Sequence, residues 1–285
     1  MILNPNYFID WLMNLRNSKN IIPGFNITLS FTLIYLFIIV ILPLSGLFFV
    51  TAKLTFSEFI DNITEPQIVS AYKVSFFCSF IAAIVSGVFG LIIAWVLAKY
   101  NFFGKKVLDY FVDLPFAVPT AVSGITLAAL YSKNGWIGSI FNKFGIEIAF
   151  TQTGIIIALI FVGFPFVVRT VEPIIKDLNN ELEEAAASLG SNKIQTFFKV
   201  TLPIIFPALL TGITTSFARA LGEYGSVIFI AGNMPMMTEI VPLVIITKLE
   251  QYDYDGATSI ALLMLLISFV MLLVINYLQK LTQRR

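Results

Sequence analysis

Two charged side chains, Arg219 and Glu223, lie inside a long apolar stretch of this 285-residue chain. They are four residues apart, so a helix would place them on one face, where they can pair. Ionisable groups at membrane depth are candidates for function, and a cation beside a pathway lowers the barrier for an anion. The alternative is a mutually neutralising structural pair near the end of a helix. The two residues alone leave both interpretations open.

The composition excludes several kinds of chemistry. The chain contains no histidine, which rules out an imidazole metal site and a histidine-dependent catalytic group. Its single cysteine, Cys78, cannot form an internal disulfide and is expected to pack as a small apolar residue. With a formal net charge of +1, the chain offers no electrostatic argument for nucleic acid as a partner. We therefore expect no catalytic residue, no metal site and no cofactor.

The chain is too apolar for a soluble domain. Hydrophobic residues make up 58% of it and charged residues 12%, whereas a typical soluble domain has about 25% charged residues. A bilayer core needs about 20 mostly apolar residues per helix. Six segments meet this requirement: Ile27–Val50, Val74–Leu97, Phe111–Tyr131, Gly154–Val171, Pro203–Ile230 and Thr258–Leu278. The sequence therefore predicts an all-α membrane protein with about six transmembrane helices.

Two of these spans are not expected to be simple rods, and one is expected to pack closely. Pro115 and Pro119 interrupt the third span. Four residues interrupt the fifth: Pro207, Gly212, Gly222 and Gly225. The second carries small residues at intervals of four, which let backbones approach closely in lipid: Ala82, Ser86, Gly90, Ala94 and Ala98. We expect this face to pack inside the helix bundle, with a role in lining a pathway as the alternative.

Lysine and arginine residues are distributed unevenly between the two sides of the predicted membrane. With a cytosolic N-terminus, twelve lie on the cytosolic side: Arg16, Lys19, Lys99, Lys105, Lys106, Arg169, Lys176, Lys193, Lys199, Lys280, Arg284 and Arg285. Five lie on the other side: Lys53, Lys73, Lys133, Lys143 and Lys248. Because cytosolic loops are enriched in these residues, both termini are expected there. The predicted organisation is a cytosolic segment 1–26 without a cleavable signal pattern, a transmembrane domain 27–280 and a cytosolic tail 281–285.

A charged segment of about 30 residues, Glu172 to Leu202, separates the fourth and fifth spans. Pro173 suits the first turn of a helix, Gly190 is a helix stop signal, and Ser191-Asn192 can cap a second short helix from Lys193 to Val200. Apolar residues recur at helical spacing on one face of the first helix: Leu178, Leu182, Ala185, Ala186 and Leu189. This helix–turn–helix segment, called the elbow below, could dock into a partner's groove or pack on its own bundle. The pattern alone does not decide between the two.

The elbow resembles the signature loop of permease subunits of ABC importers. The resemblance rests on Glu184-Ala185-Ala186, then Gly190, then Val200-x-Leu202-Pro203, with valine where the pattern usually has isoleucine. It implies an ABC importer (MetI-like) permease fold with a cytosolic coupling-helix loop at about 172–203. In that family the loop docks into a cytosolic ATPase. The resemblance therefore implies ATPase-coupling roles for six residues: Glu184, Ala185, Ala186, Gly190, Leu202 and Pro203.

ATP hydrolysis is not expected in this chain itself. No G-x-x-x-x-G-K-[ST] string occurs in it, so it cannot cradle a nucleotide by the P-loop mechanism. The family resemblance implies cytosolic ABC ATPase subunits, a second homologous permease subunit and an extracytoplasmic sulfate-binding protein as partners, besides the lipid bilayer. We therefore expect a transport subunit and not an enzyme.

The run from Phe217 to Gly225, with Ala231-Gly232-Asn233 after it, is similar to oxyanion permeases. Within that branch the chain is most similar to the T-type sulfate/thiosulfate permease subunit, and a molybdate/tungstate permease is the alternative. Arg219, Glu223, Thr211 and Thr215 are possible pathway residues, because they are charged or hydroxyl groups within a predicted span. The threonine hydroxyls could bind a passing oxyanion, or they could satisfy backbone groups freed by Pro207.

Two rival classes can be weighed against this interpretation. A stand-alone secondary transporter would show inverted repeats and broken helices; no convincing repeat is present, and such a transporter would leave the elbow unexplained. An intramembrane enzyme lacks support, because the spans contain no aspartate pair or Ser–Lys arrangement. The abundance of phenylalanine and isoleucine is typical of AT-rich genomes, which fits either a plastid membrane or the plasma membrane of a bacterium of low GC content.

Overall fold

The computed structural model of the protein describes residues 25–178 and 180–283. The chain divides after Ala52 into two compact units. All regular structure in the described residues is helical, and this confirms the predicted fold class. The predicted segment 1–26 lies almost entirely outside the described residues. Residues 281–283, predicted as part of a tail, continue the last helix.

The first unit contains one apolar helical stretch. It consists of α2 (Phe25–Leu36), the π-helical η1 (Phe37–Ile41) and α3 (Leu42–Thr51). The π turn lies directly before Pro43, where the missing backbone N–H interrupts the α-helical hydrogen-bond ladder. Ile27–Thr51 is long and apolar enough to cross a membrane, in agreement with the predicted first span.

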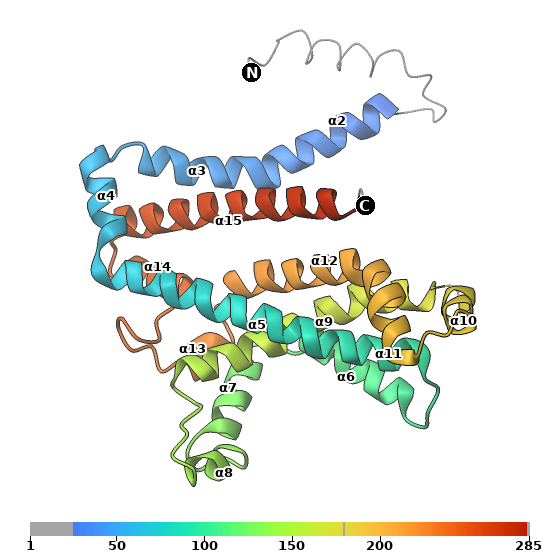
Figure 1. The fold of residues 1–285 in the computed structure, drawn as a ribbon. Helices are drawn as coiled ribbons and strands as arrows, with labels where there is room; N and C mark the ends of the chain where they lie inside the picture. The colour runs from blue at the N-terminus through green and yellow to red at the C-terminus, as the bar shows by residue number, and fades with distance from the viewer. Residues whose placement is uncertain (1–24, 179, 284–285) are drawn as a thin grey trace. The chain divides into compact units, whose positions relative to one another are not determined.

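The second unit holds four more helical stretches that could cross a membrane on their own: Pro66–Lys99, Gln152–Lys176, Lys193–Leu221 and Tyr254–Tyr277. They correspond to α5 (Pro66–Lys99), α9 (Gln152–Lys176), the run that ends in α12 (Leu202–Leu221), and α15 (Tyr254–Gln283) (Figure 1). The short α4 (Phe56–Thr64) leads into α5. It begins at a capping box, in which Glu58 accepts a hydrogen bond from the Thr55 amide at 2.8 Å.

Helices α5, α9 and α12 form the packed core of the second unit, and small residues let them approach. On α5 the predicted small-residue face is buried at Ala82, Ser86, Gly90 and Ala94. A Cβ at Gly90 would lie 2.8 Å from Val167 of α9. On α9, a Cβ at Gly163 would overlap the hydroxyl oxygen of Ser216 of α12. The small residues therefore serve close helix packing, as the sequence predicted.

The third predicted span is broken into two helices. α6 (Lys105–Ala117) and α7 (Thr120–Tyr131) meet at an angle of 111°. Val118 and Pro119 between them have extended backbones, because a residue that precedes proline is disfavoured in the helical region. The sequence placed the start of this span at Phe111, whereas the first helix begins at Lys105. The second unit continues through the short α8 (Gly138–Asn142) into α9.

The predicted fifth span, Pro203–Ile230, is too long at its C-terminal end. Helix α12 ends at Leu221, and a turn leads into the short α13 (Val227–Ile230). Glycines fix this turn against α7: a Cβ at Gly225 would overlap Thr120, and a Cβ at Gly124 would overlap the Ser226 backbone. Gly222 and Gly225, which the sequence indicated as interruptions, thus lie where the helix ends, and contact with the broken span holds the turn that follows.

Polar contacts join the elements at the end of the second unit that includes α4 and α14 (Val241–Glu250). Lys248 of α14 lies 3.4 Å from Glu65 and 3.1 Å from Asp253. A hydrogen bond from the Gly256 amide, together with Lys248, holds the pKa of Asp253 below its usual value. The helix α14 was not predicted. It is only ten residues long, about half of what a span requires, so a search for spans does not find it.

Candidate coupling elbow and pathway helix

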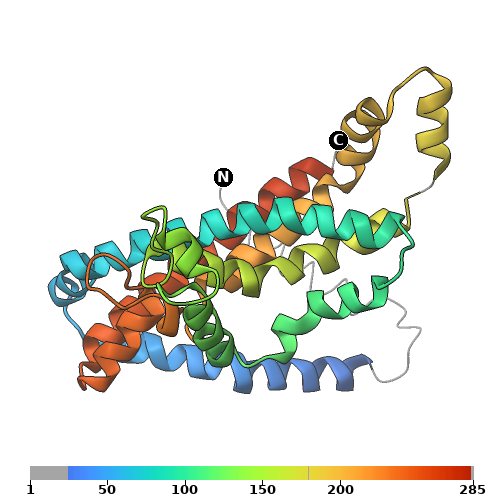
Figure 2. The same ribbon diagram turned by 90° about the horizontal axis from the view of Figure 1, so that it is seen from below.

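The elbow is a helix, a glycine turn and a second helix, as the sequence predicted. α10 (Asn180–Ser188) ends at Gly190, whose φ of +86° favours glycine. The amides of Gly190 and Ser191 donate to the Ala187 and Ala186 carbonyls, at 2.9 and 3.0 Å, and so close the helix. Asn192 then caps α11 (Lys193–Thr196) in a capping box with Gln195. Figure 2 shows the elbow beyond one end of α5.

One sequence prediction about the elbow was wrong. Pro173 does not begin its first helix but lies near the C-terminal end of α9, which runs on to Lys176. The reason is packing: Val171 and Ile175 on either side of Pro173 are 0% and 1% exposed and extend the buried face of α9. Burial of that face outweighs the missing hydrogen bond of one proline near a helix end.

The residues expected to couple to an ATPase are split between two surfaces. Glu184, Ala185 and Gly190 are exposed, whereas Ala186 is buried. Two leucines of the predicted apolar face are exposed as well, Leu182 by 45% and Leu189 by 88%. The elbow thus presents apolar side chains that its own bundle does not cover, a property typical of a docking surface. Leu202 and Pro203 form the first turn of α12.

The elbow continues directly into α12 through a π-helical turn. This turn, η2 (Phe197–Thr201), separates α11 from α12 within one unbroken helical stretch, Lys193–Leu221. π turns within longer helices are frequently found at functional sites. The elbow and α12 are therefore continuous along the chain.

The hydroxyl groups of α12 mostly bond to their own helix. Thr211, Thr214 and Thr215 donate to carbonyls one turn earlier, at 2.8–2.9 Å. Thr211 bonds the carbonyl of Pro207 itself, not one that Pro207 frees. Thr215 is exposed and Thr211 is half-buried, so both lie at the edge of a helix face that the bundle leaves open.

Arg219 and Glu223 form the predicted ion pair at the end of α12. The Arg219 Nη2 atom lies 2.8 Å from Glu223 Oε2. The other carboxylate oxygen, Oε1, accepts hydrogen bonds from the amide and hydroxyl of Ser226 at 2.9 and 3.0 Å. Glu223 is 2% exposed, whereas the Arg219 side chain is 37% exposed. Glu223 therefore holds the turn after α12, and Arg219 is the accessible member of the pair.

A charge cluster with more hydrogen bonds than the Arg219–Glu223 pair joins α6 to α9, and it was not predicted from the sequence. The Arg169 guanidinium donates to both oxygens of Asp113, at 2.8 and 2.7 Å, and to Asp109 Oδ1 at 2.7 Å. It also donates to the Asp109 carbonyl and to Glu172, and Glu172 lies 2.6 Å from Lys176. The available signal was the pair of aspartates four residues apart, matched by an arginine inside an apolar stretch.

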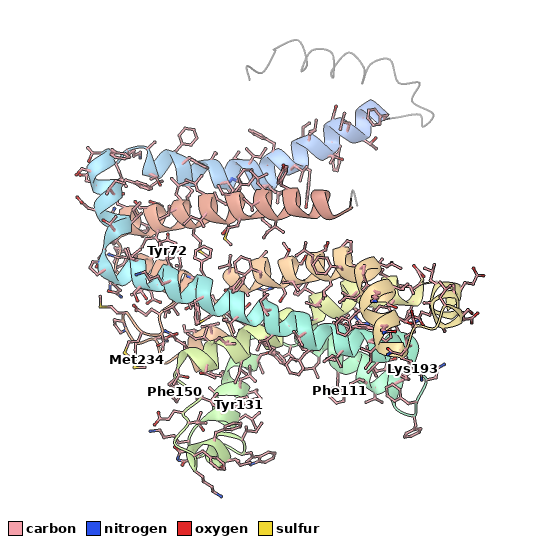
Figure 3. All side chains as sticks on the ribbon, in the orientation of Figure 1. Tyr72, Phe111, Tyr131, Phe150, Lys193 and Met234 are labelled. Atoms are coloured by element: carbon pink, nitrogen blue, oxygen red, sulfur yellow. The ribbon has the colours of Figure 1, made fainter. Side chains whose placement is uncertain are left out.

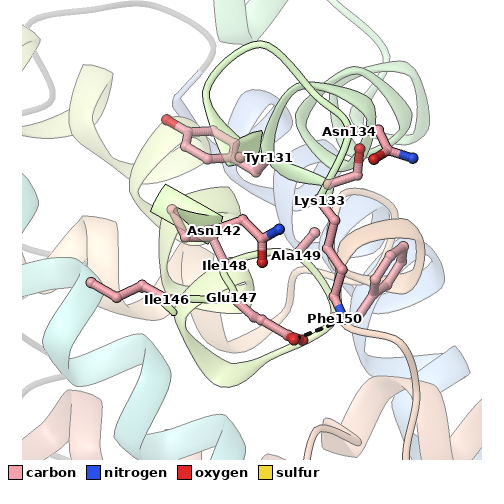
Figure 4. Close-up of a pocket in the computed structure, with 11 residues that line it drawn as sticks. Tyr131, Lys133, Asn134, Asn142, Ile146, Glu147, Ile148, Ala149 and Phe150 are labelled. Carbon is pink, nitrogen blue, oxygen red and sulfur yellow. Dashed lines mark ion pairs between the residues drawn. The ribbon is translucent and has the colours of Figure 1, made fainter. Parts of the chain in front are cut away.

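A cavity of about 260 Å³ lies in the connection between α7 and α9 (Figure 4). Its lining includes Tyr131, Asn142 and Phe150, and a 2.8 Å ion pair joins Lys133 to Glu147 there. Lys133 is the one cation among the lining residues, and Glu147 neutralises it. The cavity therefore has no electrostatic preference for a dianion. Figure 3 places Phe150 and Met234 at the end of the second unit away from Lys193 of the elbow.

Solved structures share this fold. A bacterial ABC transporter that imports alginate superposes with a TM-score of 0.74 at 18% identity, covering 96% of this chain and 97% of that one. The MetNI methionine ABC transporter superposes with a TM-score of 0.56 at 16% identity, covering 75% of this chain and 95% of that one. The helical fold with an elbow between two spans is that of an ABC importer permease.

Sequence relatives give a narrower assignment. Residues 86–285 match the family described as binding-protein-dependent transport system inner membrane component. The sulfate transport system permease protein CysT of Synechococcus elongatus is 51% identical over 254 residues, 89% of this chain and 91% of the relative. The CysT protein of Escherichia coli is 46% identical over 94% of this chain and 97% of the relative. A probable sulfate permease protein of Nephroselmis olivacea is 49% identical over 88% of each. The chain belongs to this family of inner-membrane permeases, which confirms the family resemblance.

Proposed function

We propose that this chain is the membrane permease subunit of an ATP-driven importer of sulfate or thiosulfate and forms half of its translocation pathway. The observation that carries the proposal is its identity of 44–51% with sulfate permeases over most of the chain. Such identity over nearly the whole chain supports a shared substrate more strongly than a shared fold does.

The elbow is the proposed docking point for a cytosolic ABC ATPase subunit. Glu184, Ala185 and Gly190 would contact the ATPase, because they are exposed beside uncovered leucines. Ala186 would support the elbow from its buried side, and the turn containing Leu202 and Pro203 would pass the motion to α12. The missing P-loop is consistent with hydrolysis in a separate subunit.

The open face of α12 is the proposed wall of the pathway. Thr211, Thr215 and Arg219 would line it, and Glu223 would hold the turn that positions Arg219. A second, homologous permease subunit would supply the opposite wall. An extracytoplasmic sulfate-binding protein would deliver the anion, and docking of the elbow to the ATPase would drive rigid-body opening and closing.

The membrane would be that of a plastid or the plasma membrane of a bacterium, with both termini on the ATPase side. The placement of basic residues supports this orientation. Six lysines belong to the end of the second unit that carries the elbow: Lys99, Lys105, Lys106, Lys176, Lys193 and Lys199. Basic residues are enriched on the cytosolic side of membrane proteins.

Uptake by the reconstituted complex tests the proposal. Proteoliposomes would contain this chain, its partner permease, the ATPase and the binding protein. We expect uptake of labelled sulfate that requires ATP and is inhibited by thiosulfate more strongly than by molybdate. Uptake driven by an ion gradient without ATP would favour a secondary transporter, and stronger inhibition by molybdate would overturn the substrate.

Glu184→Lys combined with Gly190→Arg tests the docking role of the elbow. Both residues are exposed, so the double variant should insert normally but lose ATP-driven transport, with added strain in the elbow from arginine at the positive φ of Gly190. Glu184→Lys alone leaves that turn intact and should also reduce transport. Lys106→Glu is the matched control, since Lys106 is an exposed charge at the same end of the second unit. Normal ATPase recovery together with normal transport in the double variant would contradict the docking role.

A further inference from the structure

The elbow contacts the C-terminal turn of α5, a helix to which neither of its ends is joined. The Lys99 Nζ atom of α5 lies 3.1 Å from Glu183 Oε1 of α10. One turn earlier on α5, the Trp95 ring meets the Phe197 ring edge-on, with 5.3 Å between centroids. Lys99 Nζ also lies 5.9 Å from the Trp95 ring. An ion pair and an aromatic contact thus lie side by side at this junction.

The ion pair is partly shielded from water. The Lys99 side chain is 19% exposed and that of Glu183 is 31% exposed. Charges in such surroundings attract each other more strongly than fully solvated pairs. Glu183 therefore differs from its neighbour Glu184, which is exposed. Two adjacent glutamates of the elbow serve two surfaces, one toward α5 and one away from it.

A hollow of about 250 Å³ lies beside this ion pair. It is lined by residues of α5, α10, α11 and the turns between them, among them Trp95, Glu183, Ala187 and Phe197. The underside of α10 is therefore not seated on a close-packed surface. Glu183, one of the lining residues, is paired with Lys99 of α5 by charge, without a hydrogen bond to its Oε1 atom.

The elbow is covalently connected to two of the three core helices. Residues 177–179 connect α10 to α9, and η2 connects α11 to α12. Helix α5 completes the core, and it has no covalent link to the elbow. The Lys99–Glu183 ion pair and the Trp95–Phe197 ring contact join α5 to the elbow without a covalent link.

We infer that Lys99 and Glu183 form a strut that positions the elbow on α5. Displacement of α10 then moves α5 together with α9 and α12, so the packed core responds as one body. The inference rests on the proposed coupling of the elbow to an ATPase and adds the route by which α5 takes part. On this inference Lys99 and Glu183 are positioning residues that act on the placement of the elbow.

Charge reversal and charge exchange test the strut. Lys99→Glu and Glu183→Lys each place like charges at the junction, and the double variant restores an opposite pair. In the reconstituted complex we expect each single variant to keep its ATPase but to transport roughly fivefold less sulfate per ATP, a ratio at the lower end of allosteric coupling. The double variant should recover to within about twofold of wild type. Lys106→Glu controls for the loss of a basic residue at this end.

The outcomes separate the strut from the proposed function. If the single variants couple normally, or if the double variant stays as impaired as the singles, the strut is wrong. If the wild-type chain does not retain an ATPase subunit, the proposed function fails and the strut fails with it. If either residue were required only for its own local contacts, the double variant would remain impaired. Recovery of transport in the double variant therefore supports the pairing of Lys99 with Glu183.

Discussion

Replacing Arg169 with glutamine is expected to loosen α6 from α9. The guanidinium makes five hydrogen bonds, four to α6 and one within α9. Glutamine keeps much of the length but lacks the charge and the planar fork that matches a carboxylate. Glu172 would retain Lys176 at 2.6 Å, whereas Asp109 and Asp113 would lose their cation.

The size of the effect follows from the exposure of the cluster. A hydrogen bond to a charged group contributes about 1.5–3 kcal/mol, and the five bonds are not additive. The Arg169 side chain is 31% exposed and those of Asp109 and Asp113 are 42% and 49% exposed, so solvent screens the cluster. A net loss of about 2–3 kcal/mol is expected, which raises the detached population of α6 roughly 30- to 150-fold.

Cysteine accessibility measures this detachment. Val112 of α6 is 2% exposed, so a Val112→Cys side chain should react slowly with a maleimide. Reaction should accelerate when Arg169→Gln is added. The native Cys78 is 0% exposed and part of a different apolar cluster, so it serves as the internal reference.

Graded variants test the geometry of the fork. Asp113 accepts two side-chain bonds and Asp109 accepts one, so Asp113→Asn should accelerate labelling more than Asp109→Asn. Arg169→Lys should restore protection only in part, because lysine supplies a point charge. Unchanged labelling of the Val112→Cys protein in the Arg169→Gln background would refute the reasoning, as would complete rescue by lysine.

Three further predictions concern other parts of the second unit. Gly163→Ala should destabilise the protein by about 1–3 kcal/mol, because the new methyl group overlaps the Ser216 hydroxyl; adding Ser216→Ala should restore the midpoint of thermal unfolding, and no recovery would show that the clash lies elsewhere. The folded protein lowers the pKa of Asp253 below its usual value of 3.8, so the ionised carboxylate contributes stability above that pH, and this contribution is lost as the pH falls through the lowered pKa. Asp253→Asn should therefore reduce the loss of thermal stability at acid pH in a series of melting curves, and a melting profile identical to that of the wild type would contradict this. Arg219→Ala should reduce sulfate uptake roughly tenfold, or about 1.4 kcal/mol of barrier, with the complex still assembled and Arg219→Lys milder; normal uptake would assign Arg219 to a structural pair.

The elbow could be predicted because its signals are local. Gly190 needs a left-handed backbone and Asn192 caps the following helix, and both act within a few residues of their own position. The spacing also predicted the pairing of Arg219 with Glu223, although Glu223 lies in the turn two residues beyond the end of α12. The spans were found because twenty apolar residues suffice to indicate one.

The remaining features depend on contacts between distant segments. Arg169 binds Asp113 and Asp109, which lie 56 and 60 positions earlier in the chain. Using Arg169 only as one of the basic residues that indicate membrane orientation therefore does not reveal its partners. The turn after α12 is held against α7, which lies about a hundred positions earlier in the chain. Pro173 misleads because the buried face of α9 continues past it. At Pro173, local propensity yields to packing.

The π turn at Phe197–Thr201 carries a rotational consequence. A helix advances about 100° per residue, and a π turn holds more residues than an α turn. Deleting one residue from this stretch would convert it to α-helix and leave the elbow at nearly the same azimuth about the axis of α12, because the π turn holds about one residue more than an α turn. Deleting one residue from the α-helical part, Leu202–Leu221, would instead swing the elbow through about 100°, so that Leu189 and Ile194 would face a different azimuth. The alignment of the elbow with the open face of α12 therefore tolerates a lost residue at the π turn but not in the helix that follows it.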